Sequence, residues 1–315
     1  MSTNAKETAL RRQKQLLSHL KGESAETNPK EQIKQVAVYG AGIMGGGIAQ
    51  VVAQAGYKVT LWDIQQSDID RGMQTIRNSL ERLSKKQEID PTSVLRRIST
   101  TTSQIQAAHA ADLVIEAIVE DLKTKQQLLE RLDKVAKPSC IFATNTSSLL
   151  VRDIAKTVSG ARKARTVALH FFNPVAIMQL VEIANADGAL LDLLKAFVRD
   201  IGKVPVVCRD TPGFIVNRLL VPYNNEARQM VERGDASIED VDTAMRLGAG
   251  YPMGPFELMD MTGIDVGYHI MKGWYEGASG LQGDPRFKPS KEVEQMIKKN
   301  HLGHKTGRGY YTYTK

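Results

Sequence analysis

The chain has 315 residues, of which 42% are hydrophobic and 24% are charged, proportions typical of a globular protein that is long enough for two domains. No apolar run approaches the roughly 20 residues that a membrane-spanning helix needs, so no integral membrane segment is predicted. The formal net charge is +7, but the basic residues form no continuous stripe of the kind that binds nucleic acid, and a nucleic-acid partner is not predicted.

The first 34 residues form a leader that differs in character from the rest of the chain. It contains no long apolar stretch of the secretory type. Leucines between residues 10 and 20 could line one face of a helix beside basic residues, as in mitochondrial targeting segments, whereas Glu7 is unusual in such a segment. The leader is therefore interpreted either as a targeting segment or as a flexible extension.

From residue 35 on, short β-branched runs alternate with longer helical patterns, which indicates a parallel sheet with crossover helices. The runs are almost continuously apolar, as in strands that are covered on both faces. Strands are predicted at residues 35–40, 58–63, 112–118, 140–146, 166–172 and 177–184, and helices at residues 42–56, 67–87 and 121–136. Cys140 and Cys208 lie within apolar segments and are expected to be reduced thiols. The fold class predicted for residues 35–210 is α/β, a Rossmann-type, doubly wound and mostly parallel sheet.

The pattern changes at the segment TPGF, residues 211–214, beyond which most of the sequence is helical. Helices are predicted at residues 214–233, 237–249 and 255–275, the last with an interruption at Gly263. Ser237 with Asp240 three residues later is close to a capping box, which marks a helix start. We place the domain boundary near Asp210 and predict an all-α domain over residues 211–315, with apolar helix faces that a second subunit could cover.

The sequence VAVYGAGIMGGGIAQ places a glycine-rich turn directly after a strand and directly before a helix. Gly40, Gly42 and Gly45 have the spacing G-x-G-x-x-G, and Ile43 and Met44 lie in the same turn. In this context the first glycine allows the tight turn, the second lets the backbone approach a pyrophosphate, and the third lets the helix pack close to the sheet. The phosphates would lie at the helix N-terminus, where free N–H groups favour negative charge.

The second predicted strand ends at Asp63, about 20 residues beyond the glycine-rich turn, where a dinucleotide-binding carboxylate is expected. A carboxylate at this position accepts hydrogen bonds from a ribose 2′-hydroxyl and repels a 2′-phosphate, and no basic residue follows in IQQSDID. The predicted cofactor is therefore NAD and not NADP. The alternative is a methyltransferase, which uses a similar turn and acid for another adenosine ligand.

The segment HFFNPVAIMQLVE, residues 170–182, places a histidine and a glutamate in two strand-like runs joined by a turn. An antiparallel pairing centred near Ala176 would bring His170 opposite Glu182. The glutamate would then accept the proton of one imidazole nitrogen and raise the basicity of the other, an arrangement that removes a hydroxyl proton during alcohol oxidation. On spacing alone, an ion pair that merely holds the hairpin explains the same residues. The nucleotide-binding turn favours catalysis, because a bound nicotinamide needs a base beside its substrate.

Two further segments carry polar candidates. The run ATNTSSL, residues 143–149, follows an apolar strand at the edge of the sheet where such folds bind ligands, although its hydroxyls could equally cap a helix. Asn217 lies one turn into the first helix of the second domain, from where its amide could reach an interdomain cleft. No metal site is predicted, because the remaining histidines have no cysteine nearby. These histidines are His19, His109, His269, His301 and His304.

Together these motifs resemble the short-chain L-3-hydroxyacyl-CoA dehydrogenases of fatty-acid β-oxidation. The resemblance extends from about residue 35 to the C-terminus. It rests on the stretches GAGIMGGGIAQ, DLVIEAIVEDL, NTSSL, HFFNPV, DTPGFIVNRLLVPY, ERGDASIEDVDTAMRLGAGYPMGPFEL and KTGRGYYTY. It implies the NAD-dependent oxidation of an L-3-hydroxyacyl-CoA to a 3-ketoacyl-CoA, and a homodimer formed through the helical domain.

The resemblance also implies roles for individual residues. Those implied in the catalytic centre are His170 as the base, Glu182 as its partner, and Ser147 and Asn217 as residues that contact the substrate oxygen. In addition to the glycine-rich turn, the residues implied near the cofactor are Asn173, Glu120 and Lys125. Those implied for the CoA phosphates lie along the basic second helix, namely Ser79 and Lys86 with Arg77, Arg82 and Lys85 as neighbours. A charged helix face of this kind is also explained by solvation alone.

The chain departs from the family pattern in the leader and around residues 185–197, where NADGALLDLLKAF is shorter than the usual segment. Neither departure touches the matched active positions. The leader leaves two compartments open, of which the mitochondrial matrix is favoured over the cytosol, and the C-terminal YTK is no peroxisomal signal.

Two other functions compete with the one that the resemblance implies. The first is a related sugar-acid dehydrogenase of the gulonate type, which GAGYPMGPFEL and the basic second helix disfavour. The second is a non-catalytic NAD-binding protein that keeps the fold for a structural role. The intact set of His170, Glu182, Ser147 and Asn217 argues against lost chemistry.

Overall fold

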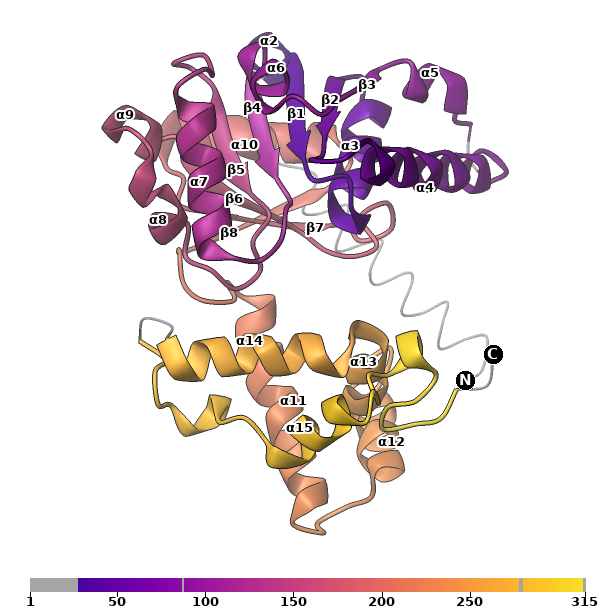
Figure 1. The fold of residues 1–315 in the computed structure, drawn as a ribbon. Coiled ribbons are helices and arrows are strands. Elements are labelled where there is room, and N and C mark those ends of the chain that lie inside the picture. Colours follow the sequence, from indigo (N-terminus) through magenta and orange to yellow (C-terminus); the bar gives the residue numbers. More distant parts are fainter. Residues whose placement is uncertain (1–27, 87, 278–279, 314–315) are drawn as a thin grey trace. The chain divides into compact units, whose positions relative to one another are not determined.

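A computed structural model of the chain describes residues 28–86, 88–277 and 280–313 (Figure 1). The chain consists of two units, the first ending at Thr211 and the second beginning at Pro212. The first unit contains the sheet and the second is helical. Residues 1–27, which make up most of the predicted leader, lie outside the described residues.

One eight-stranded sheet forms the centre of the first unit. Its strands lie in the order β3-β2-β1-β4-β5-β6-β7-β8. Neighbouring strands are parallel, except that β6 and β7 are antiparallel. The strands are β1 (Gln35–Tyr39), β2 (Lys58–Trp62), β3 (Ile98–Thr101), β4 (Leu113–Glu116), β5 (Ile141–Thr144), β6 (Thr166–Phe171), β7 (Leu180–Ala184) and β8 (Val204–Cys208). The strand order reverses between β1 and β4, as in dinucleotide-binding folds, and the predicted Rossmann-type fold is confirmed.

Strand β3 is an element that the sequence patterns do not predict. It has four residues, ISTT, and of these only Ile98 is buried. It pairs with β2 alone, at the edge of the sheet. A short, polar edge strand has no apolar run to reveal it, because it covers little of the core.

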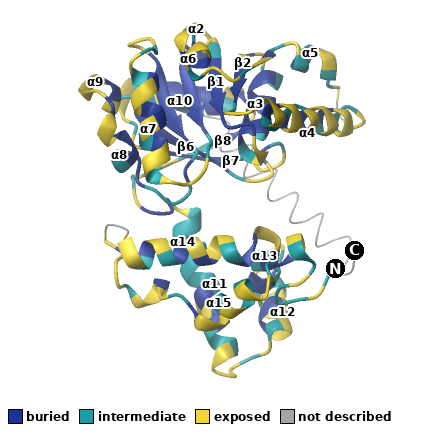
Figure 2. Cartoon of the chain, viewed as in Figure 1, coloured by how far each residue is buried: buried dark blue, intermediate teal, exposed yellow. Residues whose placement is uncertain are grey.

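Helices cover both faces of the sheet, so that the strands lie buried between them (Figure 2). Helices α3, α4 and α10 pack on one face, and α6, α7 and α8 pack on the other. Along β1, Val36 and Val38 point into the first core whereas Ala37 and Tyr39 point into the second, as the alternation of a strand requires. The helices of this unit are α2 (Pro29–Gln32), α3 (Ile43–Gln54), α4 (Gln66–Ser84), α5 (Pro91–Leu95), α6 (Gln104–His109), α7 (Leu122–Asp133), α8 (Val151–Ile154), η1 (Ala155–Thr157), α9 (Gly160–Lys163) and α10 (Gly188–Asp200).

The second unit consists of helices, as predicted. They are α11 (Val216–Glu232), α12 (Ile238–Gly248), α13 (Pro255–Thr262), α14 (Ile264–Gly277), η2 (Pro285–Phe287), α15 (Lys291–Lys298) and η3 (His304–Thr306). Gly263 separates α13 from α14 with a φ of 101°, a value that glycine adopts readily. Ser237 caps α12 by accepting a hydrogen bond from the backbone N–H of Asp240, at 3.1 Å. The predicted interruption and the predicted cap are therefore both confirmed.

The C-terminal segment KTGRGYYTY is held by one buried carboxylate. Asp260, 1% exposed, accepts hydrogen bonds from the backbone N–H groups of Tyr310 and Tyr311, each at 2.9 Å, and from the Tyr313 hydroxyl at 2.8 Å. A side chain at Gly309 would collide with this carboxylate. The charge of Asp260 therefore organises the end of the helical unit.

No helix in the described ranges is long and apolar enough to cross a membrane. Cys140 and Cys208 are both free thiols, as predicted, the first buried and the second half-buried.

Candidate active site

The two strands β6 and β7 pair in the predicted register, with His170 opposite Glu182. Nδ1 of His170 lies 2.7 Å from Oε2 of Glu182. Both side chains are buried, at 4% and 1% exposure. A carboxylate that accepts the Nδ1 proton selects the tautomer in which Nε2 is unprotonated, so Nε2 can act as a base.

Neighbouring groups fix the end of strand β6. The backbone N–H of Phe171 donates to Oδ1 of Asn145, in the loop that follows β5, at 2.8 Å. The ring of Phe172 lies with its centroid 4.5 Å from that of His170. The exposed Asn173 follows at once, at the start of the loop that leads to β7. The structure therefore brings His170, Asn173 and the segment after β5 to one end of the sheet.

The glycine-rich turn has the geometry that a pyrophosphate requires. Gly40 has a φ of 103°, and a Cβ there would lie 2.5 Å from the carbonyl oxygen of Ala117. A Cβ at Gly45 would collide with the carbonyl oxygen of Gly40, whereas a Cβ at Gly42 would meet nothing within 4 Å. Two glycines thus permit close packing, and Gly42 faces open space in front of the N-terminus of α3. The steric conditions for the three predicted roles are met, and pyrophosphate binding at Gly42 stays a prediction.

Asp63 lies directly after β2 and beside the glycine-rich turn. Its Oδ2 accepts a hydrogen bond from the Ala41 N–H and its Oδ1 accepts one from the Ile64 N–H, each at 2.7 Å. Each carboxylate oxygen has a second lone pair, so the anchored group can still accept hydrogen bonds from a ribose. The position of Asp63 is thus compatible with the predicted ribose contact, which stays a prediction.

A cavity of about 640 Å³ opens in front of the turn. This volume is within the range of roughly 300 to 1,000 Å³ that small-molecule and cofactor sites occupy. The sequence-predicted residues that line it are Gly40, Gly42, Ile43, Met44 and Asp63. Sequence reasoning missed Ile64, Gln104, Val119 and Arg131, which also line it. Ile64 and Val119 follow the ends of β2 and β4 and are 71% and 66% exposed, so an apolar residue placed just after a strand is the signal that could have revealed them.

Beneath the serine-containing loop after β5, a buried lysine joins two carboxylates, of which Glu116 is buried and Glu120 is exposed. Lys125 is 1% exposed, and its Nζ lies 2.6 Å from Oε1 of Glu116 and 3.2 Å from Oε2 of Glu120. Burial by itself would lower the pKa of Lys125, but the two carboxylates outweigh it and raise the pKa above its usual range. The ammonium of Lys125 is thus directed at Glu116 and Glu120, inside the first unit. Glu116 is the last residue of β4, inside the apolar run DLVIEAI, and sequence reasoning missed it.

The Glu120 carboxylate orders the loop that carries Ser147. Its Oε1 accepts hydrogen bonds from the Thr146 hydroxyl at 2.5 Å and from the backbone N–H groups of Ser147 and Ser148 at 3.0 and 3.1 Å. Burial by itself would raise the pKa of Glu120, but Lys125 and the hydrogen bonds from the loop hold the pKa below its usual range. Glu120 therefore remains ionised at neutral pH and fixes the loop.

The basic residues of the second helix lie on an exposed surface of α4 and just beyond its end. Gly72 of α4 packs against the carbonyl oxygen of Ala41, so the helix crosses close to the glycine-rich turn. Four cations on this surface are exposed, namely Arg77, Arg82, Lys85 and Lys86, and Ser79 is half-buried. Within the described ranges none of the four cations forms an ion pair with a carboxylate. They are available to an anionic ligand.

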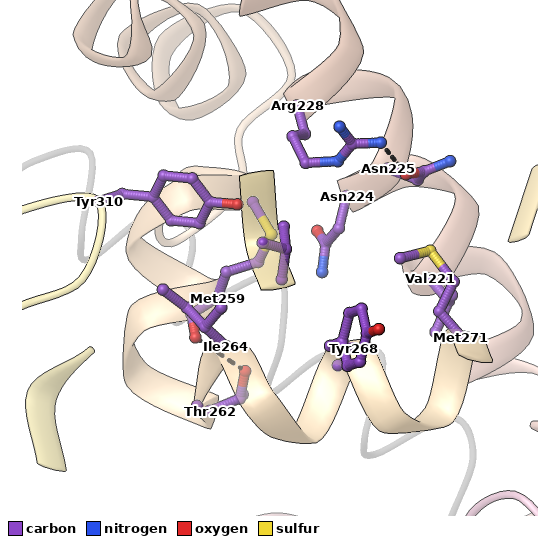
Figure 3. Close-up of a pocket in the computed structure, with 13 residues that line it drawn as sticks. Val221, Asn224, Asn225, Arg228, Met259, Thr262, Ile264, Tyr268, Met271 and Tyr310 are labelled. Atoms are coloured by element: carbon purple, nitrogen blue, oxygen red, sulfur yellow. Dashed lines mark hydrogen bonds between the residues drawn. The ribbon is translucent and has the colours of Figure 1, made fainter. Parts of the chain in front are cut away.

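Asn217 belongs to the helical unit, where it is half-buried in the first turn of α11. A small cavity of about 70 Å³ lies farther along the same helix (Figure 3). Asn224 points into it, and Arg228 donates to Oδ1 of Asn225 at 2.7 Å beside it. This volume is far below what an acyl-CoA or a dinucleotide occupies, so the cavity is not the substrate site.

A glycine-rich turn with a carboxylate directly after the second strand is the pattern of dinucleotide-binding folds, and the same sheet carries the buried histidine–glutamate pair. Comparison with known families agrees. Residues 35–211 match the family described as 3-hydroxyacyl-CoA dehydrogenase, NAD binding domain, and residues 213–313 match 3-hydroxyacyl-CoA dehydrogenase, C-terminal domain. The chain belongs to the 3-hydroxyacyl-CoA dehydrogenase family, and NAD is its cofactor, as predicted.

Individual relatives are similar over most of their length. The protein named hydroxyacyl-coenzyme A dehydrogenase, mitochondrial, of Sus scrofa is 45% identical over 95% of this chain and 98% of its own. The Homo sapiens protein of the same name is 45% identical over 89% of this chain and 91% of its own. The solved structure of (S)-3-hydroxybutyryl-CoA dehydrogenase from Ralstonia eutropha has a TM-score of 0.83 and 37% identity, and the match covers 90% of this chain and 100% of that one.

Proposed function

We propose that the chain catalyses the reversible oxidation of an L-3-hydroxyacyl-CoA to the 3-ketoacyl-CoA, the dehydrogenation step of fatty-acid β-oxidation. The observation that carries the proposal is the buried pair of His170 and Glu182, whose Nδ1 and Oε2 lie 2.7 Å apart on a dinucleotide-binding sheet. Family membership supplies the substrate class. The geometry supplies the residue that would take the proton.

Nε2 of His170 accepts the proton of the substrate hydroxyl as a hydride leaves the carbinol carbon. Bound NAD is the hydride acceptor. Glu182 stabilises the imidazolium that results, because its carboxylate holds Nδ1–H. Acid–base catalysis of this kind contributes roughly 100- to 10,000-fold to a rate. In the reverse direction His170 returns the proton to the developing alkoxide.

The loop residues orient the substrate and the cofactor. Ser147 and Asn217 hydrogen bond to the substrate oxygen, and Asn173 borders the nicotinamide. The fixed backbone of the Ser147 loop supports this role, because Glu120 accepts its N–H groups at about 3 Å. Lys125 acts on the site through Glu120, which it holds in place.

Gly42, Ile43 and Met44 would hold the pyrophosphate of NAD, and Asp63 would hold its adenosine ribose. Lys86 and Ser79, with the neighbouring exposed cations of α4, bind the phosphates of CoA. Charge complementarity supports this assignment, since the cations have no carboxylate partner within the described part of the chain. In this proposal residues 35–210 form the NAD-binding domain, and residues 211–315 form a domain for dimerisation and substrate binding.

We also propose a homodimer formed through the helical unit. Large apolar side chains on four of its helices are exposed, namely Leu219, Leu247, Met261 and Val266. Leu219 and Leu247 are 66% and 72% exposed, which is costly for leucine in water and favours burial against a second copy. Sedimentation of the purified chain tests this, and a dimer that Leu247→Glu converts to a monomer is expected. A monomeric wild type would contradict it.

The proposed compartment is the mitochondrial matrix. Two relatives that are 45% identical over most of their length are named mitochondrial. Fractionation of cells that express the full chain with a C-terminal tag tests the compartment. A tagged chain that stays in the cytosolic fraction would contradict this assignment.

The purified chain with acetoacetyl-CoA and NADH tests the reaction. We expect loss of the nicotinamide absorbance with NADH and much less with NADPH, because Asp63 repels a 2′-phosphate. L-gulonate with NAD is assayed in parallel, since turnover of the sugar acid in place of the thioester would favour the alternative dehydrogenase. NADH binding without turnover of any CoA thioester would favour a structural role and contradict the proposal.

A further inference from the structure

Lys203 is a buried cation that the proposed reaction does not use. It follows Gly202 in the connection between α10 and β8, and it is 4% exposed. Its Nζ donates to the carbonyl oxygen of Val175 at 2.5 Å and to that of Met178 at 2.8 Å. Within the described ranges, no carboxylate oxygen lies within 4.0 Å of it. Burial lowers the pKa of Lys203 to about 8. Keeping this ammonium charged inside the protein therefore costs free energy, which an apolar side chain packed at the same place would not.

The two carbonyls belong to the loop that joins the strand of His170 to the strand of Glu182. Within this loop the N–H groups of Ile177 and Met178 both donate to the carbonyl of Pro174, at 2.9 Å each, and so close one tight turn. Carbonyls at the end of such a turn carry partial negative charge, which a lysine ammonium stabilises.

The backbone beside Lys203 makes a further contact with this loop. The N–H of Val204 donates to the carbonyl of Gln179 at 2.8 Å. Three carbonyls of the loop are therefore bound by two consecutive residues of another segment.

The loop also packs on the helix of the glycine-rich turn. Val175 is buried, and a Cβ at Gly47 in α3 would lie 2.8 Å from the Cβ of Val175. The loop is thus held by two contacts, one with α3, whose N-terminus faces the proposed site of the cofactor phosphates, and one with the ammonium of Lys203. Asn173, at the start of the loop, lies two residues before Val175.

We propose that Lys203 is a positioning residue for hydride transfer: by anchoring the loop between Phe172 and Gln179 against α3, it sets where His170 and Asn173 lie relative to the cofactor. This inference rests on the proposed dehydrogenase function. Lys203 touches neither substrate nor cofactor, and it acts through the loop. A misplacement of about 1 Å in an active site costs on the order of 100-fold in rate, so a loosened loop is enough to slow the reaction.

The variant Lys203→Met, which keeps the length of the side chain and removes the ammonium, tests the proposal. We expect kcat with acetoacetyl-CoA and NADH to fall by about tenfold or more while KM for the thioester changes by less than about twofold, because the anchor acts on orientation and not on the CoA contacts. The matched control is Lys195→Met on the surface of α10, whose kcat should equal that of the wild type.

A second readout separates positioning from a loss of folded protein. Slower hydride transfer raises the kinetic isotope effect on kcat measured with NADH deuterated at the transferred position, whereas a smaller folded fraction leaves it unchanged. Val175→Ala weakens the packing of the loop on α3. Like Lys203→Met, it should lower kcat and raise the isotope effect. If Lys203→Met does not fold, Val175→Ala decides the matter by the same criteria.

Amide hydrogen exchange gives a readout that does not depend on turnover. The N–H groups of Ile177 and Met178 should exchange faster in Lys203→Met than in the wild type, even if the wild type proved inactive and the proposed function failed. Folded variants with wild-type kcat, an unchanged isotope effect and unchanged exchange in the loop would overturn the inference.

Discussion

Glu182 and His170 face each other across an antiparallel strand pair, with Oε2 of the glutamate 2.7 Å from Nδ1 of the histidine. Both side chains are almost fully buried. One nitrogen of the imidazole is therefore engaged by the fold, and in the proposed mechanism Nε2 takes the substrate proton. The hairpin would then set the tautomer as well as the place of the proposed base.

Substituting Glu182 should slow the reaction and leave the fold intact. In Glu182→Gln the amide oxygen can still accept from Nδ1–H, but the negative charge that stabilises the imidazolium is lost. Removing such a partner typically costs roughly 10- to 100-fold in activity, and we expect this loss in kcat with acetoacetyl-CoA and NADH. Glu130→Gln, an exposed change on α7, is the control. A Glu182→Gln variant with wild-type kcat would show that the pair merely holds the hairpin.

Asp63 should control cofactor affinity more than turnover. Hydrogen bonds to a charged group contribute about 1.5 to 3 kcal/mol, so Asp63→Ala should raise KM for NADH by roughly 10- to 100-fold and change kcat little. Asp63→Asn keeps one oxygen acceptor for the Ala41 N–H and serves as the milder comparison. Both are measured by steady-state kinetics at saturating acetoacetyl-CoA. An unchanged KM for NADH in Asp63→Ala would show that Asp63 does not bind the ribose.

Glu120 should make the folded state sensitive to acid. Its pKa is lower in the folded protein than its ordinary value of 4.5. A carboxylate whose pKa is lowered on folding stabilises the folded state at pH values above its ordinary pKa. This contribution is lost as the pH falls from 4.5 through the lower pKa of the folded protein. The free energy of unfolding, measured in denaturant from pH 7 to pH 3, should therefore drop less in Glu120→Gln than in the wild type. Parallel pH curves for the two proteins would contradict this assignment.

Asp260 should be a main determinant of stability in the helical unit. Asp260→Ala leaves two backbone N–H groups and the Tyr313 hydroxyl without their acceptor. Each buried group left unpaired costs about 1 to 3 kcal/mol, so a loss of at least about 2 kcal/mol is expected in chemical denaturation. Asp235→Ala, at an exposed acid of the same unit, should change stability by less than about 0.5 kcal/mol. Equal effects of the two substitutions would show that Asp260 does not anchor the C-terminal segment.

Much of this architecture can be predicted because its signals are local. The register of His170 and Glu182 follows from one loop between two apolar runs. The glycine spacing reflects the positive φ of Gly40 and the contact of Gly45 with the carbonyl oxygen of Gly40, five residues away. The helix break at Gly263 and the cap at Ser237 are equally local.

What could not be predicted depends on contacts between distant segments. Lys203 donates a hydrogen bond to Val175, and Thr144 donates one to Glu116. In each pair the two residues lie 28 positions apart in the sequence. A lone lysine or glutamate in an apolar run does not identify its partner. Strand β3 is hidden for the opposite reason, because an edge strand buries so little that its sequence is free to be polar.

The steady-state rate of His170→Gln with acetoacetyl-CoA and NADH, measured beside NADH binding by fluorescence, tests the central claim most directly. We expect a kcat at least about 100-fold below that of the wild type, with NADH affinity unchanged because the glycine-rich turn and Asp63 are untouched. A folded His170→Gln variant with kcat within about threefold of the wild type would contradict the assignment of the base.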